Sequence, residues 1–422
     1  MKKIKRVIVT VFQTMPVLIA LIPLISTHTY GGQEGTSACK KMESAKAILD
    51  CALLNHPKVL MALRALEQAK ASIDWAGQIP NPELSGAGNY GRSLGDTVVS
   101  SQVSLLQPIY FGGVVSSRKQ KARAELSLSE TDLLSSKEEV ALNTVINLYR
   151  ANQILSELEI IDETVSTFDK ILEQFKSRVK LSPDQRASVN VFELVRSDFI
   201  LKRSIVLQEE QRIGQFFEIS IGIGIEQIRK VSPSQIVWPD ILVDEVKSSA
   251  IQTPFANLQV AHAESNLANS LSWPTFKLGP SISYVYQGGI QYPSYGIGFS
   301  IDLPIFNIKG GQRSYAHSGV LKHKTKFEIA KRTLDQRKYR VVAQYNILRE
   351  SLSNSASMEQ LKVKHHKLEA LFLKGLISPA LVIEAHRQML EYIMNRNERE
   401  IEARRLLWAS YILKGSFESE VP

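Results

Sequence analysis

Two tracts of the sequence, about residues 114–228 and 312–413, carry apolar side chains at heptad spacing among polar residues. The first tract has no glycine between Val114 and Ile213. Repeats of seven with apolar side chains at two positions are typical of coiled coils, so the pattern predicts long packed helices. One seam of the first tract consists of Leu126, Leu133, Val140, Asn147, Ile154, Ile161, Phe168 and Phe175. The complementary seam consists of Ala151, Leu158, Val165, Leu172 and Val179.

Proline divides each helical tract near its middle. Of the 16 prolines, only Pro183 and Pro379 fall within the two tracts. Ser182 precedes Pro183, and Gln185 stands three positions after the serine, a pattern that predicts a capped helix start. Ser378 stands before Pro379 in the same way, so each tract is predicted to form two long helices. A helix of about 60 residues reaches roughly 90 Å, a length that suits a tube or a spacer.

A pair of strand-like segments precedes each helical tract. The first hairpin is expected at about 83–107, with its turn at 92–96. The second is expected to join residues 275–287 to residues 295–303 through a loop at 288–294. The last of these strands alternates large apolar residues with small or polar ones, which is the pattern of a wall between lipid and water.

The two halves of the chain are predicted to be copies of one unit. An offset of 196 residues places Gln107-Pro108-Ile109-Tyr110 on Leu303-Pro304-Ile305-Phe306, and Ser182-Pro183 on Ser378-Pro379. Agreement at separate points of the unit favours duplication over coincidence. The resulting division is a signal peptide at 1–26, a linker at 27–43, a first repeat at 44–230, a linker at 231–250, a second repeat at 251–414 and a tail at 415–422.

Four strands cannot close a barrel, and lipid does not tolerate an open sheet edge, because every backbone polar group there needs a partner. Several copies would therefore have to share one barrel. Three copies supply twelve strands, an even number within the bacterial range. The fold class predicted is mainly α with membrane β: a long coiled-coil helical barrel below a shared, trimeric, twelve-stranded outer-membrane barrel.

The first residues have the order of a secretory signal peptide. Four basic residues between Lys2 and Arg6 precede the mostly apolar run 7–25. Pro16 and Pro23 interrupt that run, which favours a cleaved signal over a membrane anchor. The cleavage point stays open between residues 26 and 38.

Cysteine is rare, and composition is that of a folded protein. Only Cys39 and Cys51 occur, so a local disulfide and lipidation of Cys39 are the two alternatives. Hydrophobic residues make up 44% of the chain and charged ones 22%. The formal charge of +9 is spread over long polar stretches that also contain many acidic residues, which indicates solvated helix faces and no nucleic-acid partner.

Motifs of enzymes and metal sites were sought and are missing from the sequence. It contains no phosphate loop, no HExxH, no GxSxG and no paired-cysteine motif. The neighbouring His365 and His366 point in different directions on a helix, so two solvated histidines are expected instead of a metal site. We expect no catalytic residues, no cofactor and no bound metal.

The order of elements resembles the TolC-like outer membrane efflux protein family over roughly residues 44–414. The residues that carry the resemblance are the helix-to-strand stretches 69–82 and 261–274 and the two strand-to-helix exits. The exits include Pro108, Gly112, Gly113, Pro304, Gly310 and Gly311. The segment from Gly375 to Ala385 is similar to the family's Gly-x-x-Ser turn and following helix start.

Several functional expectations follow from the resemblance. It implies a trimer in the outer membrane of a Gram-negative bacterium, with a periplasmic extension and with a periplasmic adaptor and an inner-membrane pump as partners. It places the turns at Ser182-Pro183 and at Gly375, Ser378 and Pro379 at the closed periplasmic tip. Glu384 matches a position at which the family commonly has a pore-facing acidic residue, whereas Leu381 occupies a second such position. An exposed glutamate without a pore role is the alternative for Glu384.

The function expected is an export channel of a tripartite efflux or type I secretion system, and not an enzyme. The principal alternative is a periplasmic coiled-coil adaptor or scaffold, whose strands would have polar outward faces. A family member that has lost conduction is a third reading. The exported substrate cannot be read from the sequence.

Overall fold

The computed structural model describes residues 39, 42–93, 95–231, 238–243 and 245–422. The chain divides into two units, Met1–Ser37 and Ala38–Pro422, and the second contains all of these residues. The predicted signal peptide and its cleavage point lie outside the described residues.

The first repeat begins with two helices, α2 (Ala45–Asn55) and α3 (Pro57–Ala76). They are separate because Pro57 cannot donate a backbone hydrogen bond, and the His56 side chain accepts the Lys58 N–H as a cap. Strands β1 (Glu83–Ser93) and β2 (Asp96–Tyr110) follow, so a hairpin lies where the first one was expected.

The long helices of the first repeat are α4 (Val114–Lys176) and α5 (Pro183–Ile221), followed by the short α6 (Ile225–Ile228). The predicted start of α5 is confirmed, since Ser182 and Gln185 form a capping box around Pro183. The seam prediction is wrong for Val179, which is fully exposed because α4 ends before it. Seven other residues of the two seams are buried: Val140, Ala151, Ile154, Ile161, Phe168, Leu172 and Phe175.

The second repeat contains α7 (Ser249–Ser270), β3 (Thr275–Gln287) and β4 (Ile290–Asp302). Three helices follow in place of the predicted pair: α8 (Gly310–Asn354), α9 (Met358–Leu373) and α10 (Pro379–Lys414). The additional break lies in a serine-rich segment, where Ser357 caps α9 and forms a capping box with Gln360. The prediction of a single long helix before Pro379 was therefore wrong.

The four strands form one antiparallel sheet in sequence order, β1-β2-β3-β4. The predicted loop at 288–294 is wrong, because the β3–β4 turn consists of Gly288 and Gly289 alone. Both glycines have positive φ, 58° and 88°, the conformation that a two-residue hairpin turn requires. Pro293 lies within β4, where an edge strand tolerates the missing N–H.

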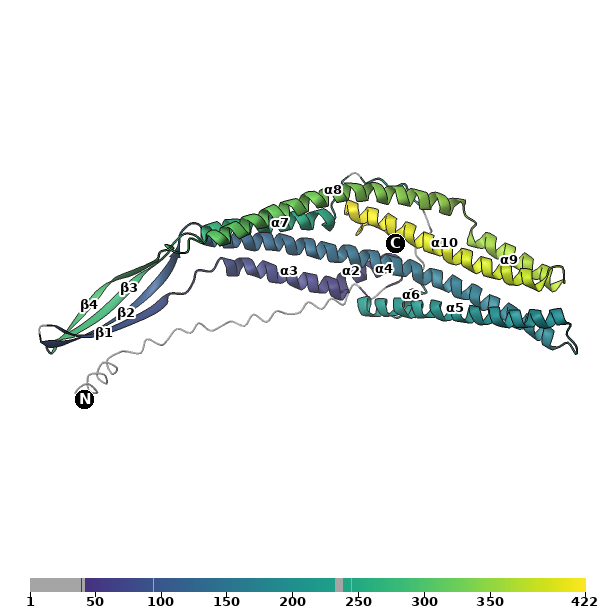
Figure 1. Cartoon of the computed structure of the whole chain (residues 1–422), viewed down its shortest axis with the longest axis horizontal. Helices are drawn as coiled ribbons and strands as arrows, with labels where there is room; N and C mark the ends of the chain where they lie inside the picture. Colours follow the sequence, from purple (N-terminus) through teal and green to yellow (C-terminus); the bar gives the residue numbers. More distant parts are fainter. Residues whose placement is uncertain (1–38, 40–41, 94, 232–237, 244) are drawn as a thin grey trace, which may run out of the picture. The chain divides into compact units, whose positions relative to one another are not determined.

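Helix α4 is the element against which both repeats pack (Figure 1). It contacts α2, α3 and α5 of its own repeat and α7 and α10 of the second. The largest buried cluster joins α4 to α5, with the Phe168 ring 5.5 Å from that of Phe192 and 5.7 Å from that of Phe199. Glu138 of α4 also accepts the Ser249 backbone N–H at 2.8 Å and so caps α7 across the repeats.

A buried ion network strengthens the contact between α4 and α5. Arg150 donates to Glu157 at 2.6 Å and to Glu209 at 2.7 Å, and Glu157 is fully buried. Burial opposes the charge of Arg150, but the two carboxylates prevail and raise its pKa. Removing Arg150 would leave a buried, uncompensated carboxylate, which is strongly destabilising.

No helix within the described parts of the chain is both long enough and apolar enough to cross a membrane.

Candidate functional site

The four-stranded sheet has one predominantly apolar face. The register places the even-numbered residues of β1 and β3 beside the odd-numbered residues of β2 and β4. The polar residues on this face are Arg92, Thr97, Ser101, Gln107 and Gln291. The apolar face consists of Leu84 and Tyr90; Val99, Val103, Leu105 and Ile109; Phe276, Leu278, Ile282, Tyr284 and Tyr286; and Tyr295, Ile297, Phe299 and Ile301.

The opposite face is mainly small and polar, with Leu106 and Val285 among the exceptions. It includes Ser85 and Asn89; Ser100, Gln102 and Ser104; Lys277, Ser281 and Ser283; and Ser294, Ser300 and Asp302. On the apolar face, Ile297 is 77% exposed and Phe299 70%. A continuous exposed apolar surface of this kind marks contact with a membrane or another protein.

Each side of the sheet ends in a strand with one neighbour. Within the described sheet, β1 pairs only with β2, and β4 only with β3. Both edge strands have 11 residues or more, so they present long rows of backbone groups without a strand partner.

Glycine and tryptophan shape the exit from β2 to α4. Gly112 and Gly113 both have positive φ, and Gly113 is the N-cap of α4. Trp273 of the second repeat lies against Gly112, where an added Cβ would be 2.2 Å from the indole. This contact joins the two repeats at the base of the sheet.

The connection from β4 to α8 differs from that between β2 and α4, although the repeated sequence predicted similar connections. Pro108 lies inside β2 and pairs with Lys277, whereas Pro304 comes after the end of β4. Gly310 and Gly311 are the first residues of α8, and the left-handed residue before them is Lys309, with φ 54°.

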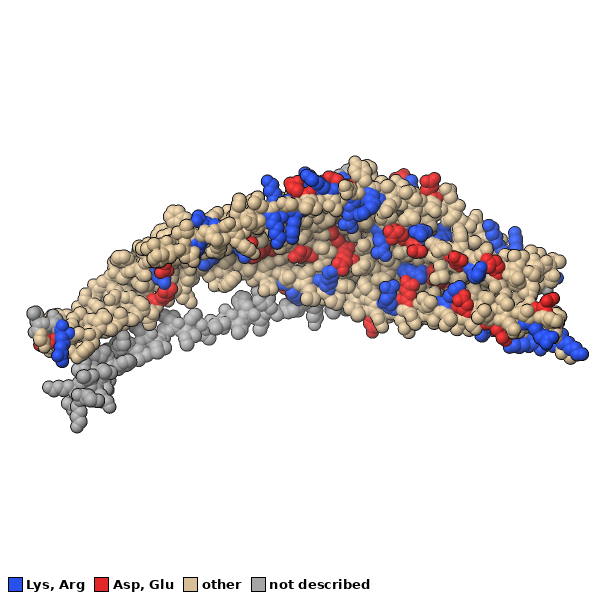
Figure 2. Space-filling model, in the orientation of Figure 1, with Lys and Arg blue, Asp and Glu red and all other residues tan. Residues whose placement is uncertain are grey.

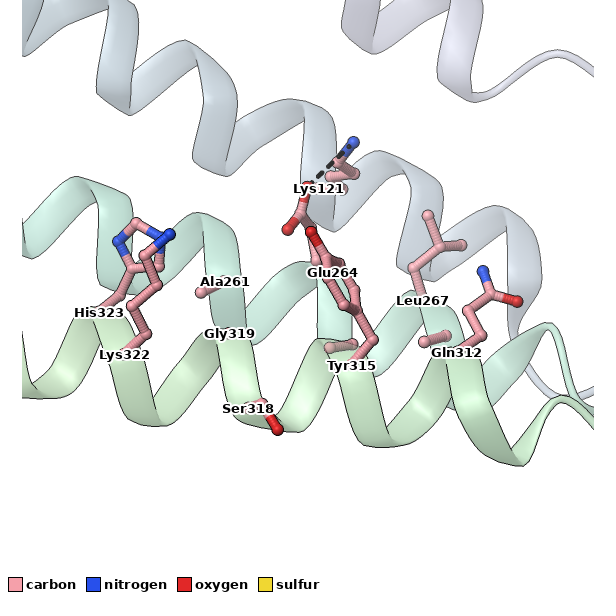
Figure 3. Close-up of a pocket in the computed structure, with 12 residues that line it drawn as sticks. Lys121, Ala261, Glu264, Leu267, Gln312, Tyr315, Ser318, Gly319, Lys322 and His323 are labelled. Atoms are coloured by element: carbon pink, nitrogen blue, oxygen red, sulfur yellow. Dashed lines mark ion pairs between the residues drawn. The ribbon is translucent and has the colours of Figure 1, made fainter.

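A groove of about 410 Å³ lies between α4, α7 and α8 below the sheet (Figure 3). Lys121 of α4 reaches across it to Glu264 of α7 at 3.5 Å. Ala261 of α7 and Gly319 of α8 line the groove, and a Cβ added at Gly319 would meet open space. Its described lining contains one histidine and one carboxylate, which are too few to bind a metal ion. We therefore interpret the groove as a gap between packed helices.

Charged side chains lie over the helices and are sparse over the strands on the face shown in Figure 2. Basic and acidic residues are interspersed there, as expected for solvated helix faces. The net positive charge thus does not form a single patch on this face.

The two turns at the ends of the long helices lie together. Ser182 accepts the Gln185 N–H at 3.2 Å and Ser378 the Leu381 N–H at 3.4 Å. Gly375, which follows α9, has a φ of 72°. Leu181 and Ile377 pack against the same buried cluster, so the turns of both repeats share one end of the helical region (Figure 1).

Glu384 is on the first turns of α10 and is half-buried. Its carboxylate accepts a hydrogen bond from Gln388 at 2.7 Å and pairs with Arg387 at 2.7 Å. These two donors, Gln388 first, lower the pKa of Glu384. The carboxylate is therefore ionised at neutral pH.

Two other sequence expectations meet different outcomes. Cys39 and Cys51 are joined by a disulfide, with their Cα atoms 5.5 Å apart, which leaves neither sulfur free. The expectation of two solvated histidines is wrong for His365, which is only 4% exposed, although His366 is exposed. His365 is buried because α9 turns it toward α4 and α10, where it meets His386.

Comparison with known proteins gives a family and a fold. Residues 48–180 match the family described as Outer membrane efflux protein. In sequence and fold, the chain resembles the TolC-like outer membrane efflux proteins. No curated protein matches the sequence closely enough to count as a relative.

Solved structures show the same fold at low sequence identity. The CmeC outer membrane channel of Campylobacter jejuni matches with a TM-score of 0.69 and 15% identity, covering 89% of this chain and 87% of that one. A membrane protein from Pseudomonas aeruginosa gives 0.67 and 17%, with 89% and 90% covered. The outer membrane protein VceC of Vibrio cholerae gives 0.61 and 14%, with 89% and 96% covered.

The family matched over residues 48–180 is one of outer membrane efflux proteins, which supports a transport role. The match likewise supports a location in the cell outer membrane. The apolar sheet face agrees with this location, because the scaffold alternative required polar outward faces.

Proposed function

We propose that three copies of the chain form one export channel through the periplasm and outer membrane. The observation that carries the proposal is a sheet with one apolar face and two open edges. In a bilayer, every backbone polar group needs a partner, so β1 of one copy would pair with β4 of the next. Three copies close a twelve-stranded barrel whose polar face lines a lumen.

The helices also present a surface suited to a second copy. Apolar side chains of α5 recur at heptad spacing on its exposed side: Val191, Leu194, Leu201 and Ile205. Leu194 is 71% exposed and Leu201 66%. An unpartnered heptad seam in a single chain fits helix packing between subunits.

Partners and processing complete the proposal. A periplasmic adaptor and an inner-membrane pump would dock at the end of the helical region where the two repeat turns meet. The chain would be exported by a signal peptide at 1–26 and would contain two repeats, at 44–230 and 251–414. The tripartite and type I systems are both compatible with a passive conduit, since the pump selects the substrate.

Glu384 is the residue we propose for the narrowest part of the closed tip. Three carboxylates around one axis would repel one another and attract cations. Arg387 beside each of them changes this expectation, because a ring of three ion pairs carries no net charge. When the tip opens, the Glu384–Arg387 pairs of the three subunits would move apart from one another.

The test is electrical recording of the purified, detergent-extracted protein in a planar lipid bilayer. A channel gives stepwise conductance increments of uniform size, because each inserted trimer opens one lumen. A preparation that inserts into vesicles but conducts nothing would favour a family member without conduction. A preparation that stays soluble and monomeric without detergent would favour the periplasmic scaffold.

A further inference from the structure

Two buried histidines face one carboxylate where three helices meet. His365 and Glu369 are one turn apart on α9, and His386 lies on α10. His365 is 4% exposed and His386 2%. Glu163 of α4 borders the same cluster. The three helices thus contribute imidazole and carboxylate groups to one buried point.

The Nε2 atoms of both histidines lack a hydrogen-bond partner among the described residues. His386 Nδ1 lies 2.8 Å from the Val382 carbonyl oxygen, which can only accept, so Nδ1 carries the proton. The Nε2 of His386 is therefore a free lone pair, and the Nε2 atoms of both histidines are buried without a hydrogen bond in the described residues. Buried polar atoms are rarely left unpaired, since each costs about 1–3 kcal/mol.

The backbone of α10 fixes the orientation of the His386 ring, because the Val382 carbonyl oxygen lies 2.8 Å from Nδ1. A backbone carbonyl that orients a ring through Nδ1 is the usual support of a histidine ligand.

The spacing of the donor atoms fits a small tetrahedral ion. Donors about 2.0–2.2 Å from a zinc ion lie roughly 3.3–3.6 Å from one another at the tetrahedral angle. Glu369 Oε1 is 3.4 Å from His365 Nε2 and 3.8 Å from His386 Nε2. Glu163 Oε1 is 3.7 Å from His365 Nε2. Movements of a few tenths of an ångström would bring these histidine–carboxylate pairs to coordinating separations, and the donor atoms of His365, Glu369 and His386 all lie within 4.8 Å of one another.

We propose that His365, His386 and Glu369 bind a divalent zinc ion, with Glu163 as the nearest fourth donor. Two imidazoles and carboxylates suit Zn²⁺, whereas Mg²⁺ and Ca²⁺ prefer all-oxygen sites. Thr167 donates to the same oxygen, Glu369 Oε1, at 2.8 Å and so orients the carboxylate. The ion would join α9 and α10 to α4 close to the turn at Gly375.

The test measures binding of Zn²⁺ to the full-length, chelator-treated protein in detergent. Isothermal titration is expected to give one ion per chain, and His365→Gln or Glu369→Gln to weaken its binding by about tenfold or more. His317→Ala is the matched control, because His317 is an exposed histidine of α8 and does not belong to the cluster. It should bind within about threefold of the unchanged chain.

Cobalt substitution gives a readout that needs no variant. Co²⁺ in the proposed site would show the strong visible absorption of tetrahedral coordination, and Zn²⁺ would displace it stoichiometrically. Absence of binding by the unchanged protein would overturn the proposal, as would loss of binding in His317→Ala with no loss in His365→Gln. Neither result depends on channel conductance, so the site and the proposed function fail separately.

Discussion

At the scale of single residues, the pairing of Glu384 with Arg387 decides the charge of the proposed pore ring. The carboxylate of Glu384 is ionised, and the guanidinium lies 2.7 Å away on the same helix face. A glutamate without this neighbour would make the ring strongly cation-attracting. With it, removing either charge leaves three like charges of the other sign around the axis.

Substitution of the two residues should therefore shift ion selectivity in opposite directions. Glu384→Gln leaves Arg387 uncompensated and should lower the permeability ratio of K⁺ to Cl⁻ by roughly twofold. Arg387→Gln should raise that ratio by a similar factor. Reversal potentials across a KCl gradient in a planar bilayer measure both. If the K⁺ to Cl⁻ permeability ratio is the same in both variants and in the unchanged channel, Glu384 does not line the pore.

Sequence patterns predicted individual residues well only where the interaction is local. The capping box of Ser182 and Gln185 spans three residues, so its letters are enough to identify it. His365 was misjudged because its partners come from other helices, Glu163 more than two hundred residues earlier and His386 beyond the Gly375 turn. The one local signal was Glu369, one helical turn after His365.

At the scale of secondary-structure elements, the register of the sheet separates lipid-facing from lumen-facing positions. Ile297, near the middle of β4, is on the apolar face, and Ser294 of the same strand is on the polar face. Ile297→Arg should lower the free energy of unfolding by about 2–4 kcal/mol, because it places a charge against lipid. Ser294→Arg should have little effect.

Urea titration of the protein refolded into lipid vesicles measures this difference. Ser294→Arg is a fair control because both side chains are exposed in the single chain and belong to one strand. Equal losses in the two variants would mean that the sheet does not have one face in lipid.

The predicted elements failed where a turn or break depends on few residues. The turn of the second hairpin consists of Gly288 and Gly289 only. The sequence predicted a longer loop because Pro293 follows shortly after them, yet Pro293 lies within β4. The break before α9 was missed because no proline marks it, and Ser357 supplies the cap instead. The alternation of Tyr295, Ile297 and Phe299 was correctly predicted because sheet periodicity is a local property.

At the scale of the whole molecule, the open sheet edges and the exposed α5 seam both require a partner of the same kind. A single chain would leave two strand edges in lipid and a row of leucine and isoleucine side chains in water. Two copies could close only an eight-stranded barrel, whose interior is filled by side chains and leaves no lumen for export. Only a closed ring removes every edge, and three copies give the twelve strands of the proposed barrel.

Native mass spectrometry of the detergent-extracted protein should accordingly show three times the mass of the processed chain. Leu201→Asp should reduce the trimer fraction several-fold, because it places a charge in the α5 seam, where burial between subunits would strip it of water. Ser204→Asp, exposed on the same helix, should leave the trimer intact. If Leu201→Asp assembles as fully as Ser204→Asp, the α5 seam does not lie between subunits. If the unchanged protein is a monomer in every detergent, the edges must be closed in some other way and the shared barrel is wrong.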